Sequence, residues 1–185
     1  MRQYAFALAT VVAAALSTTA WADTAVDLEL VLAVDISRSM DPDELQVQRD
    51  GYLKALTHPD IIAAIASGAH KKIALSYVEW AGPAMQYVAV DWRVIDGSAS
   101  AQAFADALAQ APIQAFRGTS ISGGIAFIKG RFENNGFEAP RHVIDVSGDG
   151  PNNMGMPIEM AREDAVRAGI TINGLPIMIK QAGDF

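Results

Sequence analysis

The chain has 185 residues, and its 21 acidic side chains outnumber its 14 basic ones to give a formal net charge of −7 at pH 7. This acidic balance disfavours nucleic acids and anionic membrane surfaces as partners, because both carry negative charge themselves. The sequence contains no cysteine, which excludes disulfides and thiol chemistry, and its length suits one domain with a substantial core.

The first 22 residues have the three parts of a signal peptide. Residues 1–3 are basic, residues 4–16 are apolar and alanine-rich, and Ala20–Ala22 forms a small-x-small cleavage site. The apolar part is too short to hold the chain in a bilayer as a stable anchor. The sequence therefore predicts an exported protein, periplasmic or secreted, with a mature domain over residues 23–185.

Residues 28–40, which read LELVLAVDISRSM, organise the rest of the chain. The apolar run 30–34 is typical of a strand that is buried on both faces of a parallel sheet. Polar groups gather in the crevice beyond the carboxyl end of such a strand. Asp35, Ser37 and Ser39 follow at alternate positions, and a site made only of oxygen ligands suits a hard cation rather than zinc or copper.

Two helices and two strands are predicted next. Residues 41–44 (DPDE) form a strong helix start with a capping box. A shorter helix begins after His58-Pro59 and stops at Gly68. The strands Lys72–Trp80 and Met85–Ile95 are joined by a short turn, so we expect an antiparallel pair at the edge of an otherwise parallel sheet.

Helices and strands continue to alternate through the second half of the chain. The predicted elements are a helix at Ser98–Gln110, a helix from Gly118-Thr119 to Asn135-Gly136, a strand at Arg141–Ser147, a helix at Pro157–Ala168 and a strand at Ile170–Ile179. This order predicts a three-layer, Rossmann-like α/β fold with a mostly parallel central sheet.

Three segments resemble the parts of a metal-ion-dependent adhesion site (MIDAS), the cation site of von Willebrand factor type A (vWA) domains. They are Asp35-x-Ser37-x-Ser39, Gly118-Thr119 before a helix, and Ser147-Gly148-Asp149-Gly150 after a strand. The order and spacing of the three segments match those of a MIDAS, and the predicted order of strands and helices resembles that of a vWA domain over essentially the whole mature chain. The stretches 77–82 and 143–150 are also similar to an uncharacterised, exported bacterial branch of that family.

The resemblance implies a role for each of five residues. Ser37 and Ser39 would bind the ion directly, Thr119 would bind it directly or through water, and Asp35 and Asp149 would hold metal-bound waters. Magnesium is the expected ion, with manganese or calcium as alternatives. Because neutral hydroxyls leave the cation poorly neutralised, it would remain a strong acceptor for a carboxylate presented by a protein partner.

Taken one at a time, the same residues have ordinary structural explanations. Asp35 and Asp149 are common turn residues, Ser37 and Ser39 can bond to loop backbone, and Thr119 can cap a helix. Only the combination predicts a metal site. Asp145 lies inside an apolar strand, where a lone carboxylate is costly, and it receives no role.

A second interpretation is a magnesium-dependent phosphatase similar to the haloacid dehalogenases. Those enzymes use a nucleophilic aspartate with a second aspartate two residues later as acid and base. Here Asp35 is followed by Ser37 at that position, so the general acid is absent, and nothing specific supports Lys129 as the phosphate-binding lysine. We therefore expect a binding domain rather than an enzyme.

The end of the chain leads to one further expectation. Only Lys180–Phe185 follow the last predicted strand, whereas the resemblance implies at least one more helix and usually another strand. We expect the C-terminal part of the fold to be missing, with apolar surface of the sheet left uncovered.

Overall fold

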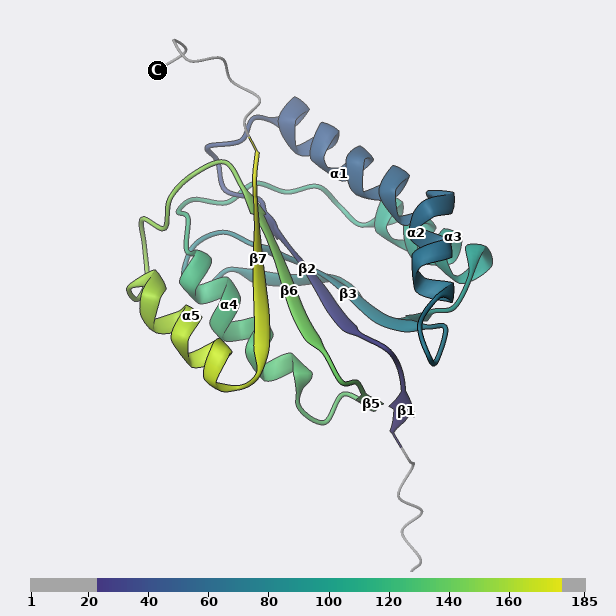
Figure 1. Ribbon diagram of the computed structural model, residues 1–185. Coiled ribbons are helices and arrows are strands. Elements are labelled where there is room, and N and C mark those ends of the chain that lie inside the picture. The colour runs from purple at the N-terminus through teal and green to yellow at the C-terminus, as the bar shows by residue number, and fades with distance from the viewer. Residues whose placement is uncertain (1–22, 178–185) are drawn as a thin grey trace, which may run out of the picture.

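A five-stranded sheet forms the middle layer of the molecule (Figure 1). The computed structural model describes residues 23–177, so the predicted signal peptide lies outside the described residues. The strand order is β4-β3-β2-β6-β7, with parallel neighbours except for β3 and β4. The strands are β2 (Glu29–Asp35), β3 (Ile73–Trp80), β4 (Gln86–Ile95), β6 (His142–Gly148) and β7 (Ile170–Pro176).

The strand β2 lies at the centre of the sheet, as its apolar run predicts. All but one of its residues are buried, because β3 and β6 flank it and helices cover both faces. The register pairs Asp35 with Trp80 of β3 and Val34 with Ser147 of β6. The first and third parts of the predicted site therefore meet at one edge of the sheet.

The predicted antiparallel pair is confirmed, and β4 is an edge strand of the sheet. A tight turn joins it to β3, in which Met85 N donates to the Gly82 carbonyl at 3.0 Å and Ala81 N donates to the Met85 carbonyl at 3.0 Å. The strand β7 ends at Pro176, before the predicted end at Ile179, which itself lies outside the described residues.

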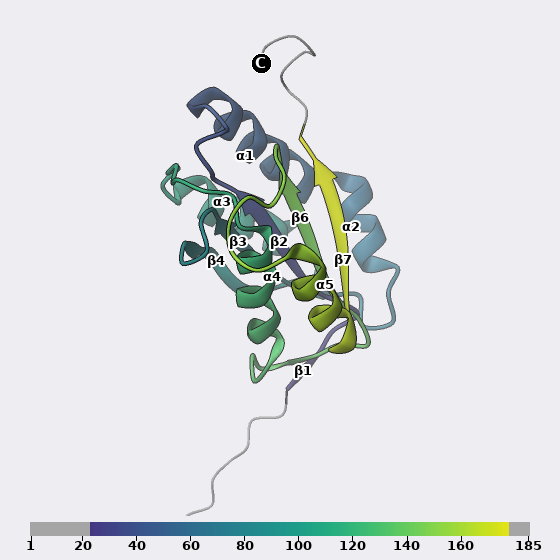
Figure 2. The same cartoon turned by 90° about the vertical axis from the view of Figure 1, so that its left-hand side faces the viewer.

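Helices cover the two faces of the sheet and complete the predicted three-layer fold (Figures 1 and 2). One face packs against α1, α2 and α3 through Phe104 and Leu108, and the other packs against α4 and α5 through Ile125 and Ala165. The helices are α1 (Pro42–Leu56), α2 (Pro59–Ala66), α3 (Ser98–Gln110), α4 (Ile121–Lys129) and α5 (Ile158–Arg167). A 3-10 turn, η1 (Gly130–Phe132), follows α4, and short strands β1 (Thr24–Ala25) and β5 (Phe137–Glu138) form a separate parallel pair.

The start of α1 is the predicted capping box. The side chain of Asp41 accepts from Glu44 N at 2.9 Å, and the Glu44 carboxylate accepts from Asp41 N at 2.8 Å.

The helix predicted to open at Gly118-Thr119 begins later, at Ile121, because Ser120 is its N-cap. No helix within residues 23–177 combines the length and the apolar character needed to cross a membrane.

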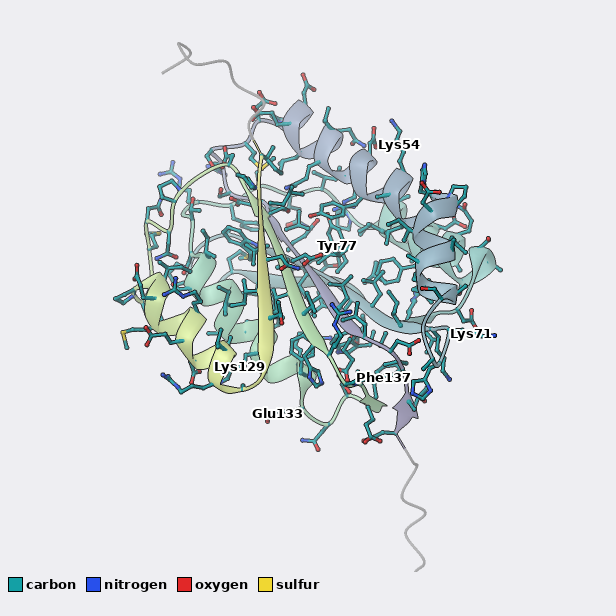
Figure 3. All side chains as sticks on the ribbon, in the orientation of Figure 1. Lys54, Lys71, Tyr77, Lys129, Glu133 and Phe137 are labelled. Atoms are coloured by element: carbon teal, nitrogen blue, oxygen red, sulfur yellow. The ribbon has the colours of Figure 1, made fainter. Side chains whose placement is uncertain are left out.

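A buried ion pair joins α1 to β3 and α3. Arg49 pairs with Glu79, and its guanidinium also donates to the carbonyls of Leu108 at 2.8 Å and Ala111 at 3.2 Å. The same guanidinium lies 5.5 Å from the centre of the Tyr77 ring, which is labelled in Figure 3 near the middle of the sheet. Burial raises the pKa of Glu79 while Arg49 lowers it, so Glu79 depends on Arg49 for its charge.

We expect Arg49→Met to lower the free energy of unfolding by about 3 kcal/mol, because it leaves Glu79 buried without a partner. Adding Glu79→Leu should recover most of that loss, since an apolar pair needs no charge compensation. Urea denaturation at pH 7 measures both changes. Lys54→Met, on the exposed side of the same helix, is the control and should cost less than 0.5 kcal/mol. Equal losses for Arg49→Met and Lys54→Met would contradict this account.

Candidate metal site

The site begins where β2 ends. The Oδ1 atom of Asp35 accepts from Ser37 N at 2.7 Å, which turns the chain sharply after the strand. Ser37 Oγ lies 2.8 Å from Ser39 Oγ, and Ser39 Oγ donates to Asp149 Oδ1 at 2.7 Å. A continuous series of hydrogen bonds therefore joins Asp35, Ser37, Ser39 and Asp149, four of the five predicted site residues.

Asp35 is fully buried, and its second oxygen has no partner. The Oδ2 atom is inaccessible and forms no hydrogen bond with residues 23–177. Burial raises the pKa of Asp35 to about 6; the hydroxyl and N–H of Ser37 lower it, and the negative charge of Asp149 raises it. An unpartnered buried carboxylate oxygen is a costly feature that a cation, or water held by a cation, would relieve.

Gly148 leaves the space above this oxygen open. A Cβ atom at position 148 would lie 2.9 Å from Asp35 Oδ2, closer than such atoms pack, and 3.2 Å from Asp35 Cβ, tighter than most such contacts. The glycine in the Ser147-Gly148-Asp149-Gly150 segment is therefore needed for steric reasons. It lets the β6 backbone pass beside the carboxylate of the central strand.

Thr119, the fifth predicted residue, reaches the site on a neighbouring loop. Its side chain is buried. Its loop is joined to the first one by Arg38 N, which donates to the Phe116 carbonyl at 2.8 Å, and by Phe116 N, which donates to the Ile36 carbonyl at 2.9 Å. Because Ser120 caps α4, the hydroxyl of Thr119 is not needed as a cap.

Two asparagines for which the sequence predicts no role lie in the third loop of the site, which follows β6. They hold this loop against the loop of Thr119 and the start of α4. Asn153 Oδ1 accepts from Thr119 N at 3.0 Å, and Asn153 N donates back to the Thr119 carbonyl at 2.9 Å. Asn152 Oδ1 accepts from Ser122 N at 3.0 Å in the first turn of α4. The Pro-Asn-Asn sequence is a turn signal, but nothing in it indicates that its amides bind another loop.

Asp145, for which the sequence predicts no role, is hydrogen-bonded to the neighbouring strand β7. Its Oδ1 atom accepts from Asn173 Nδ2 of β7 at 2.7 Å, so the carboxylate is partnered across the edge of the sheet. Ser147 is also used structurally: Tyr52 OH donates to its Oγ at 2.9 Å and Gln48 Nε2 donates at 3.3 Å. These contacts attach α1 to β6 just below the site.

The donor set fits a hard cation. It consists of three hydroxyls and two carboxylates, all oxygen, which is the preference of magnesium, manganese and calcium. Residues 23–177 contain no group of three or more His, Cys, Asp or Glu side chains placed to hold a metal ion. Any ion bound at this site would therefore depend on the hydroxyls of Ser37, Ser39 and Thr119.

Solved structures with the same fold come from several sources. Proximal thread matrix protein 1 from the mussel byssus, in a structure with a zinc-occupied MIDAS motif, has a TM-score of 0.66 at 13% identity, with 82% of this chain and 38% of that chain covered. The pilus adhesin SpaC from Lactobacillus rhamnosus GG has a TM-score of 0.59 at 14% identity (89% and 26% covered). A von Willebrand factor type A structure from Catenulispora acidiphila has a TM-score of 0.56 at 16% identity (80% and 33% covered). This chain covers less than half of each of these proteins.

The strand order and these similarities together show that the chain has the vWA fold. It belongs to the family described as "Protein of unknown function (DUF1194)", whose pattern matches residues 25–184. No curated protein sequence matches the chain.

The raised pKa of Asp35 predicts an unusual pH dependence of stability without metal. Because the folded state binds the proton with a pKa of about 6 against an ordinary 3.8, the stabilising contribution of this group is complete below about pH 4 and is lost as the pH rises through 6. The loss amounts to about 3 kcal/mol. Urea denaturation in EDTA at pH 5 and pH 7.5 should show a larger fall for the wild type than for Asp35→Asn. Equal falls for the two proteins would contradict the shift.

Proposed function

We propose that this domain binds a protein partner through a divalent cation held by Ser37, Ser39 and Thr119, with Asp35 and Asp149 holding metal-bound waters. The observation that carries the proposal is the series of hydrogen bonds that joins Asp149, Ser39, Ser37 and Asp35, together with the buried, unpartnered Oδ2 atom of Asp35. When bound, the cation would supply an open coordination position with most of its charge intact, because its direct ligands are neutral hydroxyls.

The residues around the site favour an acidic ligand. Arg38 lies between Ser37 and Ser39, and Arg117 comes two residues before Thr119. Both arginines are exposed, and neither forms an ion pair with residues 23–177. The backbone bond from Arg38 N to Phe116 O holds their two loops side by side. A carboxylate that coordinated the cation would therefore have two unpaired positive charges close to it.

We place the protein outside the cytoplasm, in the periplasm or secreted. The support is the predicted signal peptide over residues 1–22, and structural neighbours that include a pilus adhesin and a byssus matrix protein agree with such a setting. Magnesium is the proposed ion, with manganese or calcium as alternatives.

Binding is favoured over phosphatase chemistry for a geometric reason. Lys129, the candidate phosphate-binding lysine, is the last residue of α4, about 12 Å along the helix from its first turn beside Thr119. Figure 3 labels it at the end of the helix remote from the carboxyl ends of the strands. Its amino group pairs with Asp164 of α5. No second carboxylate follows Asp35 at the position of Ser37.

The metal part of the proposal predicts a rise in melting temperature with magnesium. A ligand at 100 times its Kd stabilises the native state by about 2.7 kcal/mol, which corresponds to roughly 5–10 °C for a domain of this size. Differential scanning fluorimetry in millimolar magnesium and in EDTA measures the shift. Ser39→Ala should abolish it, whereas Ser98→Ala, an exposed serine on α3, should leave it unchanged. Identical wild-type curves with magnesium and with EDTA would rule out the site.

The partner part of the proposal predicts a binding that resists salt but not chelation. Direct coordination is little affected by ionic strength, whereas long-range attraction is screened beyond about 8 Å at physiological salt. An immobilised wild-type domain should retain its partner from a native envelope extract at 0.3 M salt and release it in EDTA. Thr119→Ala should lose this partner while its melting temperature in EDTA stays within about 2 °C of the wild type. A partner that binds the chelated domain equally well would refute the proposal.

A further inference from the structure

A second candidate site lies between α4, α5 and the strands β6 and β7. Its cavity has a volume of about 300 Å³ and is mainly apolar. Figure 2 shows α4 and α5 in front of the sheet on this face, with β7 beside α5. The side chains that carry the argument are Trp80, Ile121, Ile125, Val146, Ile158 and Ile172.

Trp80 forms part of the wall of this cavity. The residue is fully buried, and its Nε1 atom has no hydrogen-bond partner among residues 23–177. A glycine makes room for the ring: a Cβ atom at Gly124 would lie 3.1 Å from Trp80 Cγ, tighter than most such contacts.

Arg162 brings an unpaired positive charge to the same cavity. It lies on α5, lines the cavity and is exposed, so it stands where the cavity meets solvent. It forms no ion pair with residues 23–177. The neighbouring cations differ, because Lys129 and Arg167 both pair with Asp164.

We propose that this cavity binds a small aliphatic carboxylate. The aliphatic part would lie against the isoleucines of α4, α5 and β7 and release water from apolar surface. The carboxylate would accept charge-assisted hydrogen bonds from Arg162. The isoleucine-lined wall accounts for the affinity, and the arginine accounts for the preference for an anion. The proposal does not depend on a metal at the MIDAS-like site.

Calorimetric titration with octanoate in EDTA tests the proposal, because chelation removes any cation that could bind the carboxylate elsewhere. Octanoate should bind saturably, octanol about tenfold more weakly, and octylamine not at all. Arg162→Gln should reduce octanoate affinity to that of octanol. Arg167→Gln, which removes a charge from the same helix, is the matched control and should bind octanoate as the wild type does.

Ile172→Trp provides a second variant, since the larger side chain would fill the cavity and should abolish binding of both octanoate and octanol. Circular dichroism would show whether each variant is folded. The proposal is overturned if the wild type shows no saturable octanoate binding, or if octanol binds as tightly as octanoate. Equal affinities for Arg162→Gln and Arg167→Gln, or unchanged binding by a folded Ile172→Trp, would also overturn it.

Discussion

The structure depends above all on the burial of one carboxylate at the end of its central strand. Asp35 follows directly from the apolar run of β2, so the strand that organises the core also carries the most costly polar group. Gly148 and the turn to Ser37 are arranged around that group, one by leaving space and the other by donating a hydrogen bond. A protein with a typical stability of 5–15 kcal/mol can tolerate an unfavourable contribution of about 3 kcal/mol, and contributions of this kind are concentrated at functional sites.

Three loops surround this carboxylate: one follows β2, one precedes α4 and one follows β6. Hydrogen bonds, most of which involve the backbone, hold the three loops together. The Ser37–Phe116 bridge joins the first loop to the second, and the exchange between Thr119 and Asn153 joins the second to the third. The bond from Ser39 to Asp149 closes the ring of loops. The first two links hold main-chain atoms in place, and the last one joins the side chains of Ser39 and Asp149, which are themselves predicted site residues.

The sequence was sufficient for the features that depend on local patterns. The apolar run of β2 predicts a strand buried on both faces, residues 41–44 predict a capped helix start, and the short turn before β4 predicts an antiparallel edge pair. The structure confirms all three. Long-range contacts were not predictable. The asparagines at 152 and 153 look like ordinary turn residues, and Arg49 and Glu79 lie far apart in the sequence with nothing to indicate that they pair. The predicted start of α4 was also wrong: Thr119 and Ser120 are both favoured cap residues, and in the structure Ser120 caps the helix while the backbone of Thr119 bonds to Asn153.

An acidic protein that recognises an acidic ligand needs its positive charge concentrated at one place. The formal net charge of −7 is spread over the whole chain, whereas Arg38 and Arg117 lie on two loops that a backbone bond joins at the proposed cation site. Repulsion between two acidic surfaces fades beyond about 8 Å at physiological salt, while the interactions at the site act at contact distance. The sign of the overall charge therefore limits how fast and how nonspecifically such partners meet, and the local arrangement of the two arginines and the hydroxyl-bound cation would decide which of them remain bound.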